Sequence, residues 1–278
     1  MKNLFYILVR SPKFIAGLII LVFMLGFMWV YPLIDTDDPR APRGLAFDPP
    51  TRELPLGTDN FGRDVILELA YGMRTSLYVG VVAGLTATLI GLTLGLIAGF
   101  VGGLTDNIIN TITNMFIVIP PFIVLILISV SLQTRSVGVM AFVIGVTAWP
   151  WTARAVRAQT SSLRVRDHVN IARISGYGLP RLIIQSVLPY IASYVFMAFI
   201  LQMASAILAE ASLSMLGLGP NNTISLGLML NWAMLFEGPM KGAWWSFVPV
   251  ALIIGLVTFA LKLMNSGMDQ VFNPKIRS

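Results

Sequence analysis

Residues 164–190 read RVRDHVNIARISGYGLPRLIIQSVLPY, a polar and arginine-rich segment that interrupts an otherwise apolar chain. The stretches before and after it are long enough to cross a bilayer, which takes about 20 apolar residues in a helix. Loops on the cytoplasmic side of membrane proteins are enriched in lysine and arginine. We therefore expect these residues, called here the 164–190 insert, to form a docking surface that faces the cytoplasm between two membrane spans.

The composition places most of the chain in lipid. Of 278 residues, 56% are hydrophobic and 12% are charged, whereas about a quarter of the residues of a typical soluble domain are charged. Too few charges remain to cover a soluble globule. In such a chain a net charge of +6 reports cytoplasmic loops and anionic lipid headgroups. We expect membrane lipid, and no nucleic acid, among the partners.

Several kinds of site are excluded by residues that the chain lacks. It has no cysteine and a single histidine, His168, so disulfides, thiolate metal sites and multi-histidine metal sites are excluded. No GxxxxGK[ST] phosphate-binding loop occurs, and the one histidine lies in the basic insert, where no Ser/His/Asp set is expected. We predict no catalytic residue, no metal and no cofactor bound by this chain, which is not an enzyme by itself.

Six apolar stretches predict an all-α integral membrane protein with six transmembrane helices. The first stretch is longer than the apolar region of a signal peptide and lacks a small-residue cleavage site, so we expect it to be retained. We divide the chain into an N-terminal span with an extracytoplasmic loop, residues 1–74, and a core of five spans, residues 75–278. The expected spans cover approximately residues 15–33, 76–101, 108–132, 137–155, 190–216 and 244–264.

The charges orient these spans. With six spans, both termini, the turn near Asp106 and the 164–190 insert share one side, which carries twelve lysines and arginines against three acids. The other side, with the 35–74 and 219–242 loops, carries seven against nine. The positive-inside rule places the first side, and both termini, in the cytoplasm. A multi-pass protein of a prokaryotic cytoplasmic membrane is expected.

The 164–190 insert predicts two short helices separated by a bend. Residues 167–175 form the first, opening with Asp167, and Gly176 and Gly178 end it because glycine tolerates the left-handed conformation of a helix exit. Pro180 suits the first turn of a second helix, residues 181–188. A short, stiff element joined directly to a span can transmit force. An ordinary amphipathic interface helix is the alternative.

Glycines and a single acid stand out within the spans. Gly84, Gly91, Gly95 and Gly99 recur at near-helical spacing, which allows another backbone to approach closely. Glu210 is the one clear acid inside a span, and such a charge is costly and by default a functional candidate; a structural hydrogen bond to neighbouring helices is the alternative. Further candidates for a pore face, each of which could equally serve helix packing, are Ser212, Ser214, Met215, Thr113, Asn114 and Phe116.

Tryptophans suggest where the spans meet the membrane surface. Trp149 and Trp151 in one stretch, and Trp244 and Trp245 in another, are expected to be interfacial anchors, because indole rings favour the headgroup level.

The insert resembles the EAA loop of permease subunits of ABC importers. That loop reads Glu-Ala-Ala, three residues, Gly, about nine residues, then a hydrophobic residue, one residue and Leu-Pro. Here Asn170-Ile171-Ala172 occupies the first position, Gly176 the glycine, and Val187-Leu188-Pro189 the end. The family glutamate and first alanine are replaced by Asn170 and Ile171. The resemblance implies contact with a separate ATPase through His168, Asn170, Ile171, Ala172, Arg173, Gly176, Gly178 and Arg181.

Other motifs are similar, in order, to the C-type permease subunit of dipeptide, oligopeptide and nickel importers. They are LGTDNFGRDV at 56–65, LAYGMRTSL at 69–77, GLIAGFVGG at 95–103, WPWTARAVRAQTSSLR at 149–164, ILAEASLSMLGLG at 207–219 and the closing D-x-x-x-NP-x-x-R at 269–277. The resemblance implies a type I ABC-importer permease fold with cytoplasmic coupling helices between spans four and five.

The same resemblance implies the partners. They are a second permease subunit, two ATP-binding subunits that carry ATP and magnesium, and an extracytoplasmic solute-binding protein. Peptide, oligosaccharide and metal chelate all remain open as cargo. The competing interpretation is a self-sufficient secondary transporter or channel, which predicts paired charges inside the membrane and function without a partner.

Overall fold

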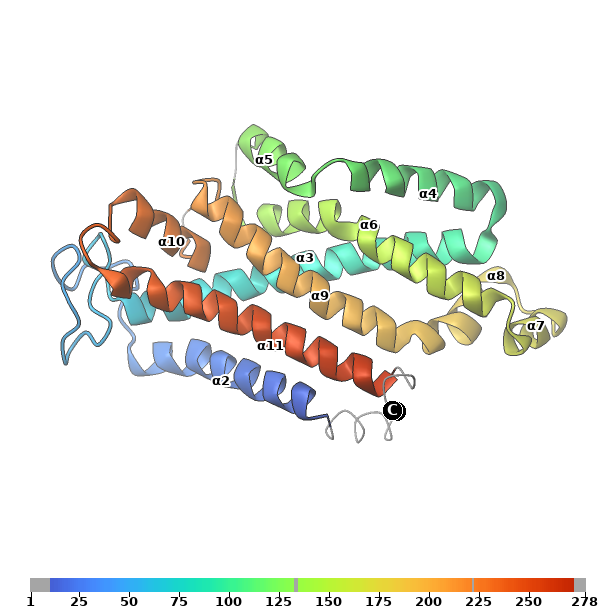
Figure 1. Ribbon diagram of the computed structural model, residues 1–278, viewed down its shortest axis with the longest axis horizontal. Helices are drawn as coiled ribbons and strands as arrows, with labels where there is room; N and C mark the ends of the chain where they lie inside the picture. The colour runs from blue at the N-terminus through green and yellow to red at the C-terminus, as the bar shows by residue number, and fades with distance from the viewer. Residues whose placement is uncertain (1–10, 133–134, 222, 273–278) are drawn as a thin grey trace.

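The computed structural model describes residues 11–132, 135–221 and 223–272, and there the chain is built from helices (Figure 1). Five helices are long and apolar enough to span a membrane, or up to six if a bent pair counts as one span. The helices are α2 (Pro12–Ile34), α3 (Val65–Val101), α4 (Gly103–Val118), α5 (Pro121–Ser131), α6 (Val137–Arg164), α7 (Asp167–Ile174), α8 (Leu179–Leu182), the π turn η1 (Ile183–Val187), α9 (Leu188–Met215), α10 (Leu226–Leu235), the 3₁₀ turn η2 (Trp244–Ser246) and α11 (Val248–Phe272).

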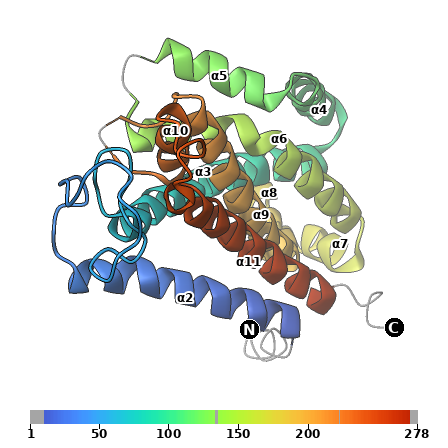
Figure 2. The ribbon, with the colours of Figure 1, turned by 60° about the vertical axis from the view of Figure 1, so that its left-hand side comes forward.

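The long helices lie side by side, and the connections gather at two ends (Figures 1 and 2). One end, called here the α7 end, holds α7, α8, the α3–α4 turn, the start of α2 and the finish of α11. The other end, called here the α10 end, holds the 35–64 loop, α10 and η2, where Trp245 Nε1 donates to Thr58 O at 3.1 Å. The predicted grouping of segments by side is therefore confirmed for the described residues. The terminal charges Lys2, Arg10, Lys275 and Arg277 lie outside them.

The helices extend beyond the predicted spans where polar residues continue a helix. α3 begins at Val65, eleven residues before the predicted start, because Asp64 caps it by accepting a hydrogen bond from Ile66 N at 2.8 Å. α6 continues to Arg164 rather than ending near Ala155. Hydropathy marks the part of a helix that suits lipid. α3 extends beyond that part at its start, and α6 extends beyond it at its end.

The third predicted span is broken. Pro120 and Pro121 separate α4 from α5, which meet at a bend of 81°. Pro120 lacks a backbone N–H and disfavours helical geometry in the residue before it, so α4 ends at Val118 and Pro121 opens α5. The span predicted over approximately 108–132 is therefore formed by two helices, which count as one span only if the bent pair is taken together.

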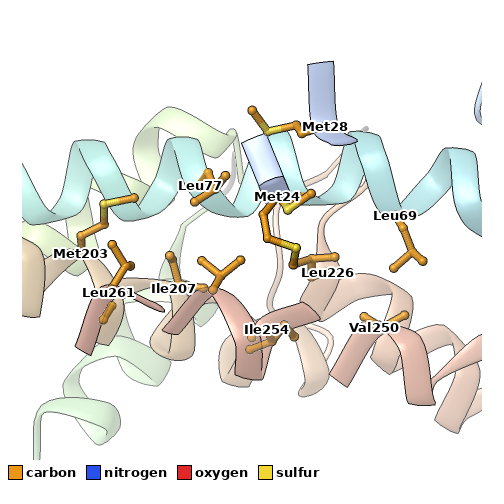
Figure 3. Packing of buried hydrophobic residues seen from close by; sticks show 14 of the residues in the cluster. Met24, Met28, Leu69, Leu77, Met203, Ile207, Leu226, Val250, Ile254 and Leu261 are labelled. Carbon is orange, nitrogen blue, oxygen red and sulfur yellow. The ribbon is translucent and has the colours of Figure 1, made fainter. Parts of the chain in front are cut away.

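The main core lies between α2, α3, α9, α10 and α11 (Figure 3). Figure 3 shows Met24 of α2 facing Leu226 of α10, and Ile207 of α9 beneath Leu77 of α3. α10 was missed in the sequence because ten residues are too few for a span, yet its Leu226, Met229 and Ala233 are buried. It closes the α10 end of the helix bundle.

The glycines of α3 allow close helix packing, as predicted. A Cβ added at Gly91 would lie 2.6 Å from Thr152 Cβ, and one at Gly99 would lie 2.6 Å from Arg157 O, both on α6. At Gly84 it would lie 3.0 Å from Met203 N on α9. These positions have no room for a side chain, so α3 is the central helix against which α6 and α9 are set.

The 35–64 loop is held by an arginine. Arg43 donates to Asp35 Oδ2 at 2.6 Å and to Asp64 Oδ2 at 3.2 Å, and it also pairs with Asp37. The hydrogen bond from Arg43 holds the pKa of Asp35 below its ordinary value. Because Asp64 caps α3, Arg43 fastens the loop to the start of that helix.

Candidate functional site: the α7 segment and an intramembrane groove

The 164–190 insert places α7 against the beginning of α9. Val169 is fully buried and belongs to a cluster with Leu182, Val187 and Ile191. His168 Nε2 lies 3.1 Å from Ser186 O, and its ring stacks on Tyr190 with centroids 4.4 Å apart. α7 is therefore packed directly against η1 and the beginning of α9.

α7 ends in a Schellman motif that requires glycine. Tyr177 N donates to Ala172 O at 3.2 Å, and Gly176 N donates to Arg173 O at 3.1 Å. This pair of bonds needs a residue in the left-handed region between them, and Gly176 has φ of +82°. The expectation that Gly176 ends the helix is confirmed.

Gly178 has a different role from the predicted one. Its φ of −69° and ψ of 161° are extended backbone that any residue adopts, and it precedes α8. The second helix leads into the fifth span: α8, the π turn η1 and α9 follow one another without a break from Leu179 to Met215. Single π turns are often found at functional sites. The prediction of a helix over 181–188 that leads into the fifth span is therefore confirmed, and Pro189 sits in the first turn of α9, where its missing N–H costs little.

The predicted coupling residues divide between an outward and an inward face. Ile171 and Arg173 are exposed, as are Gly176, Gly178 and Arg181. His168, Asn170 and Ala172 are partly buried, and Asn170 Nδ2 donates to Val165 O at 3.4 Å. Ile174, which is outside the set of predicted coupling residues, is 88% exposed. Ile171 and Ile174 together present an apolar, unpartnered ridge at the α7 end.

Glu210 lies in a fully buried hydrogen-bond cluster. Its Oε2 accepts from Ser76 Oγ at 2.9 Å, and its Oε1 accepts from Ser214 Oγ and Ser225 Oγ, each at 2.7 Å. Ser214 is buried as well. Both residues are enclosed within this chain. The carboxylate joins α3, α9 and the cap of α10, and within the described residues no basic side chain pairs with it.

The other pore candidates lie on two different helices, α9 and α4. Ser212 and Met215 are exposed near the end of α9, where Ser212 Oγ donates to Leu208 O at 2.8 Å. On α4, Thr113 is buried and donates to Ile109 O at 2.7 Å. Asn114 and Phe116 are exposed and contact α6.

The α4 contacts with α6 are specific. Asn114 Oδ1 accepts from Arg154 Nη2 at 2.7 Å, and the Phe116 ring lies 5.4 Å from that of Trp149. The structure thus brings these two candidates together on one side of α6. A pore-lining role stays a prediction for each residue of the set.

Sequence reasoning missed a groove in the middle of the helix bundle. Gln202 is the fifteenth of 28 residues in α9, and Trp151 is the fifteenth of 28 in α6. Trp149 and Trp151 lie near the middle of α6, and their role as interfacial anchors stays a prediction. The groove, called here the Gln202 groove, has a volume of about 350 Å³ and is lined by Pro121, Ala148, Trp151, Leu201, Gln202 and Ser205.

One polar residue organises the Gln202 groove. Gln202 Nε2 donates to Ala148 O and to Thr152 Oγ1, each at 2.9 Å, and so ties α9 to α6. A glutamine inside an otherwise apolar stretch of α9 was the signal in the sequence. It was not among the predicted candidates because it carries no charge, and charge is what marks a residue inside a span as costly.

The comparisons with known proteins agree with this architecture. Residues 91–278 match the family described as binding-protein-dependent transport system inner membrane component. The chain is 32% identical over 270 residues to the dipeptide transport system permease protein DppC of Bacillus subtilis, covering 96% of this chain and 83% of that protein.

Two further relatives cover most of the chain. The oligopeptide transport system permease protein OppC of Mycobacterium tuberculosis is 31% identical over 83% of this chain and 79% of its own length. A putative peptide transport system permease protein of Brucella suis is 29% identical over 97% and 90%. The chain belongs to the family of inner-membrane permease components of binding-protein-dependent ABC transport systems.

Proposed function

We propose that this chain is one half of the membrane pathway of an ATP-driven peptide importer. A second permease subunit completes the pathway, two ATP-binding subunits dock at the α7 end, and an extracytoplasmic solute-binding protein delivers cargo at the α10 end. In this arrangement both termini are cytoplasmic, as the charge asymmetry predicts. ATP and magnesium belong to the partner subunits.

The observation that carries the proposal is the junction between α7 and α9. α7 presents Ile171 and Ile174 outward, while Val169 and His168 fasten its inner face to Val187 and Ser186. An ATPase that moves the ridge would move the continuous helix from Leu179 to Met215 with it. Rigid-body displacement of a packed element is a common form of switching.

Peptide cargo is favoured over oligosaccharide or metal chelate by the relatives, which are named for dipeptide, oligopeptide and peptide transport. The residues of this chain support a permease rather than a self-sufficient transporter. Glu210, the acid inside a span, is held by three serine hydroxyls. A proton or ion relay would require paired charges there.

Reconstitution tests the proposal. Vesicles containing this chain, its partner permease and the ATPases should accumulate labelled peptide only when ATP and the loaded binding protein are both present. Vesicles containing this chain alone should show no uptake. Solute movement by this chain without partners would overturn the proposal, and co-purification of the ATPase with the intact chain is the complementary expected result.

A further inference from the structure

The Gln202 groove lies next to irregular backbone, which lipid cannot satisfy with hydrogen bonds. Beside it lies the irregular backbone of the α4–α5 break, where Val118 is 81% and Ile119 is 50% exposed. Irregular backbone at membrane depth is tolerated only where it is buried in protein or lines a water-filled cavity. Pro121, directly after the break, is itself part of the groove. The groove therefore opens toward protein or water.

Two polar atoms in the groove have no partner among the described residues. Both hydrogen bonds of the Gln202 amide use Nε2, which leaves Oε1 as a free acceptor. Ser205, one helical turn further along α9, is exposed, and its hydroxyl makes no hydrogen bond within the described part of the chain. Ser212 on α9 and Thr147 on α6 each donate to the carbonyl four residues earlier. Ser205 instead keeps its donor for another group.

The donated hydrogen bonds fix the direction of the Gln202 side chain. Nε2 donates to Ala148 O and Thr152 Oγ1, and because a carbonyl oxygen only accepts, the amide plane cannot turn over without losing the bond to Ala148 O. Oε1 is therefore a preset acceptor. Ser205 can both donate and accept. Trp151 and Leu201 supply apolar walls, and none of the residues that line the groove is charged.

We infer that the Gln202 groove is a contact site for the main chain of a translocating peptide. A peptide backbone offers an N–H donor and a C=O acceptor at every residue, which Gln202 Oε1 and Ser205 Oγ match. Uncharged apolar walls favour no particular side-chain charge. Main-chain recognition of this kind would let one pathway accept peptides of many sequences. This inference rests on the proposed function, and it adds a substrate contact within this chain.

The chain has no cysteine, so a cysteine introduced into the groove is the only thiol of this chain that a reagent can label. In the complete importer, assembled with cysteine-free partners, Ser205→Cys should react with a small charged thiosulfonate that enters water but not lipid. Its labelling rate should fall several-fold while peptide is being transported. The control is Phe259→Cys. Phe259 is 54% exposed near the middle of α11. We expect this position to face lipid and the cysteine there to stay unreactive.

The outcomes separate the inference from the proposed function. An importer in which peptide uptake and ATPase stimulation are intact, but whose Ser205→Cys variant is unreactive or is labelled equally with and without peptide, refutes the groove as a substrate contact and leaves the permease function standing. Cross-linking of Ser205→Cys to the partner permease, with no effect of peptide, also refutes it. Failure of the unmodified chain to support any uptake would instead refute the proposed function.

A second pair of variants removes the alternative that Gln202 only fastens two helices. Thr152→Val deletes one of the hydrogen bonds that hold the amide but leaves Oε1, whereas Gln202→Leu deletes both roles. If Oε1 contacts peptide, Gln202→Leu should reduce peptide transported per ATP hydrolysed several-fold more than Thr152→Val does, with equal thermal stability. Equal transport by the two variants would contradict the inference.

Discussion

Ser76 of α3 donates a hydrogen bond of 2.9 Å to the carboxylate of Glu210 on α9, although 134 residues separate them in the chain. Both side chains are buried. The same Ser76 hydroxyl accepts from Leu226 N at 3.3 Å, so one small side chain joins α3, α9 and the start of α10. The acid is thereby built into the α10 end of the helix bundle.

This relationship predicts how Glu210 variants behave. Glu210→Leu leaves the hydroxyls of Ser76, Ser214 and Ser225 without their acceptor, and each unsatisfied buried group costs about 1–3 kcal/mol. Glu210→Gln keeps one carbonyl acceptor and should be milder. We expect Glu210→Leu to lower the thermal stability of the purified complex markedly, and Glu210→Gln to retain most transport. Abolished uptake in a stable Glu210→Gln complex would show that the charge has a direct part in transport.

We expect substitutions at Gly176 to be damaging because of the backbone conformation of this residue, and not because neighbouring atoms leave no room for a side chain. A Cβ there would meet nothing within 4 Å, but φ is +82°, and the left-handed region costs other residues about 1–2 kcal/mol. Gly176→Val should distort the end of α7 and reduce peptide uptake and ATPase stimulation several-fold without affecting membrane insertion.

Gly178 provides the matched control for this prediction. It is also exposed and has no neighbour within 4 Å of an added Cβ, yet its φ is −69°. Gly178→Val should transport nearly as well as the unchanged protein, and Gly176→Asn should be less damaging than Gly176→Val because asparagine tolerates the left-handed region. Equal loss in both valine variants would show that the bend, rather than the conformation of one residue, is what matters.

The α3–α6 contact predicts a strong effect at Gly91. A leucine side chain there must displace Thr152 Cβ and Ala153 N, which would lie 2.6 and 2.9 Å from its Cβ. Since both neighbours belong to a rigid helix, α3 and α6 must separate. Gly91→Leu should reduce the yield of folded protein severalfold, as judged by monodispersity in detergent. Gly255→Leu on α11, where an added Cβ meets nothing within 4 Å, should leave that yield unchanged.

The 35–64 loop should loosen in acid. The pKa of Asp35 is lowered by its hydrogen bond from Arg43, so the pair stabilises the loop at pH above the ordinary value of about 3.9 and is lost as the pH falls through the folded pKa. Burial raises the pKa of Asp59, so ionisation of Asp59 destabilises the loop, and its protonation in acid stabilises the loop. Hydrogen exchange of loop amides, corrected for the intrinsic rate, should show protection falling below about pH 4.

A neutral variant isolates the Asp35 contribution. Asp35→Asn should lower loop protection at neutral pH and remove most of its acid dependence. Asp48→Asn in the same loop should preserve the dependence, because Asp48 forms no ion pair with Arg43 within the described residues. An unchanged acid profile in Asp35→Asn would assign it to other carboxylates.

Local chemistry explains which features could be predicted from the sequence. The end of α7 was predictable because Gly176 determines it through a single backbone angle. The α3 glycines were predictable because their spacing reports a helix face. The Gln202 groove was not, since it arises where α6, α9 and the α4–α5 break meet, and no segment alone records that meeting. The angle of the break at Pro120 was likewise hidden, because proline marks a bend without fixing its direction.

The exposed ridge of α7 gives the most direct test of the ATPase contact. Ile174 is 88% and Ile171 64% exposed, and burying an isoleucine in a partner surface is worth about 1.5–3 kcal/mol. Ile174→Asp would place a charge in that interface and should reduce co-purification of the ATPase by at least tenfold. Ile184→Asp offers a control, because Ile184 is also exposed at 60% but lies on η1 rather than on the ridge. We expect it to retain the ATPase. Normal ATPase recovery with Ile174→Asp would show that the subunit docks elsewhere on the α7 end.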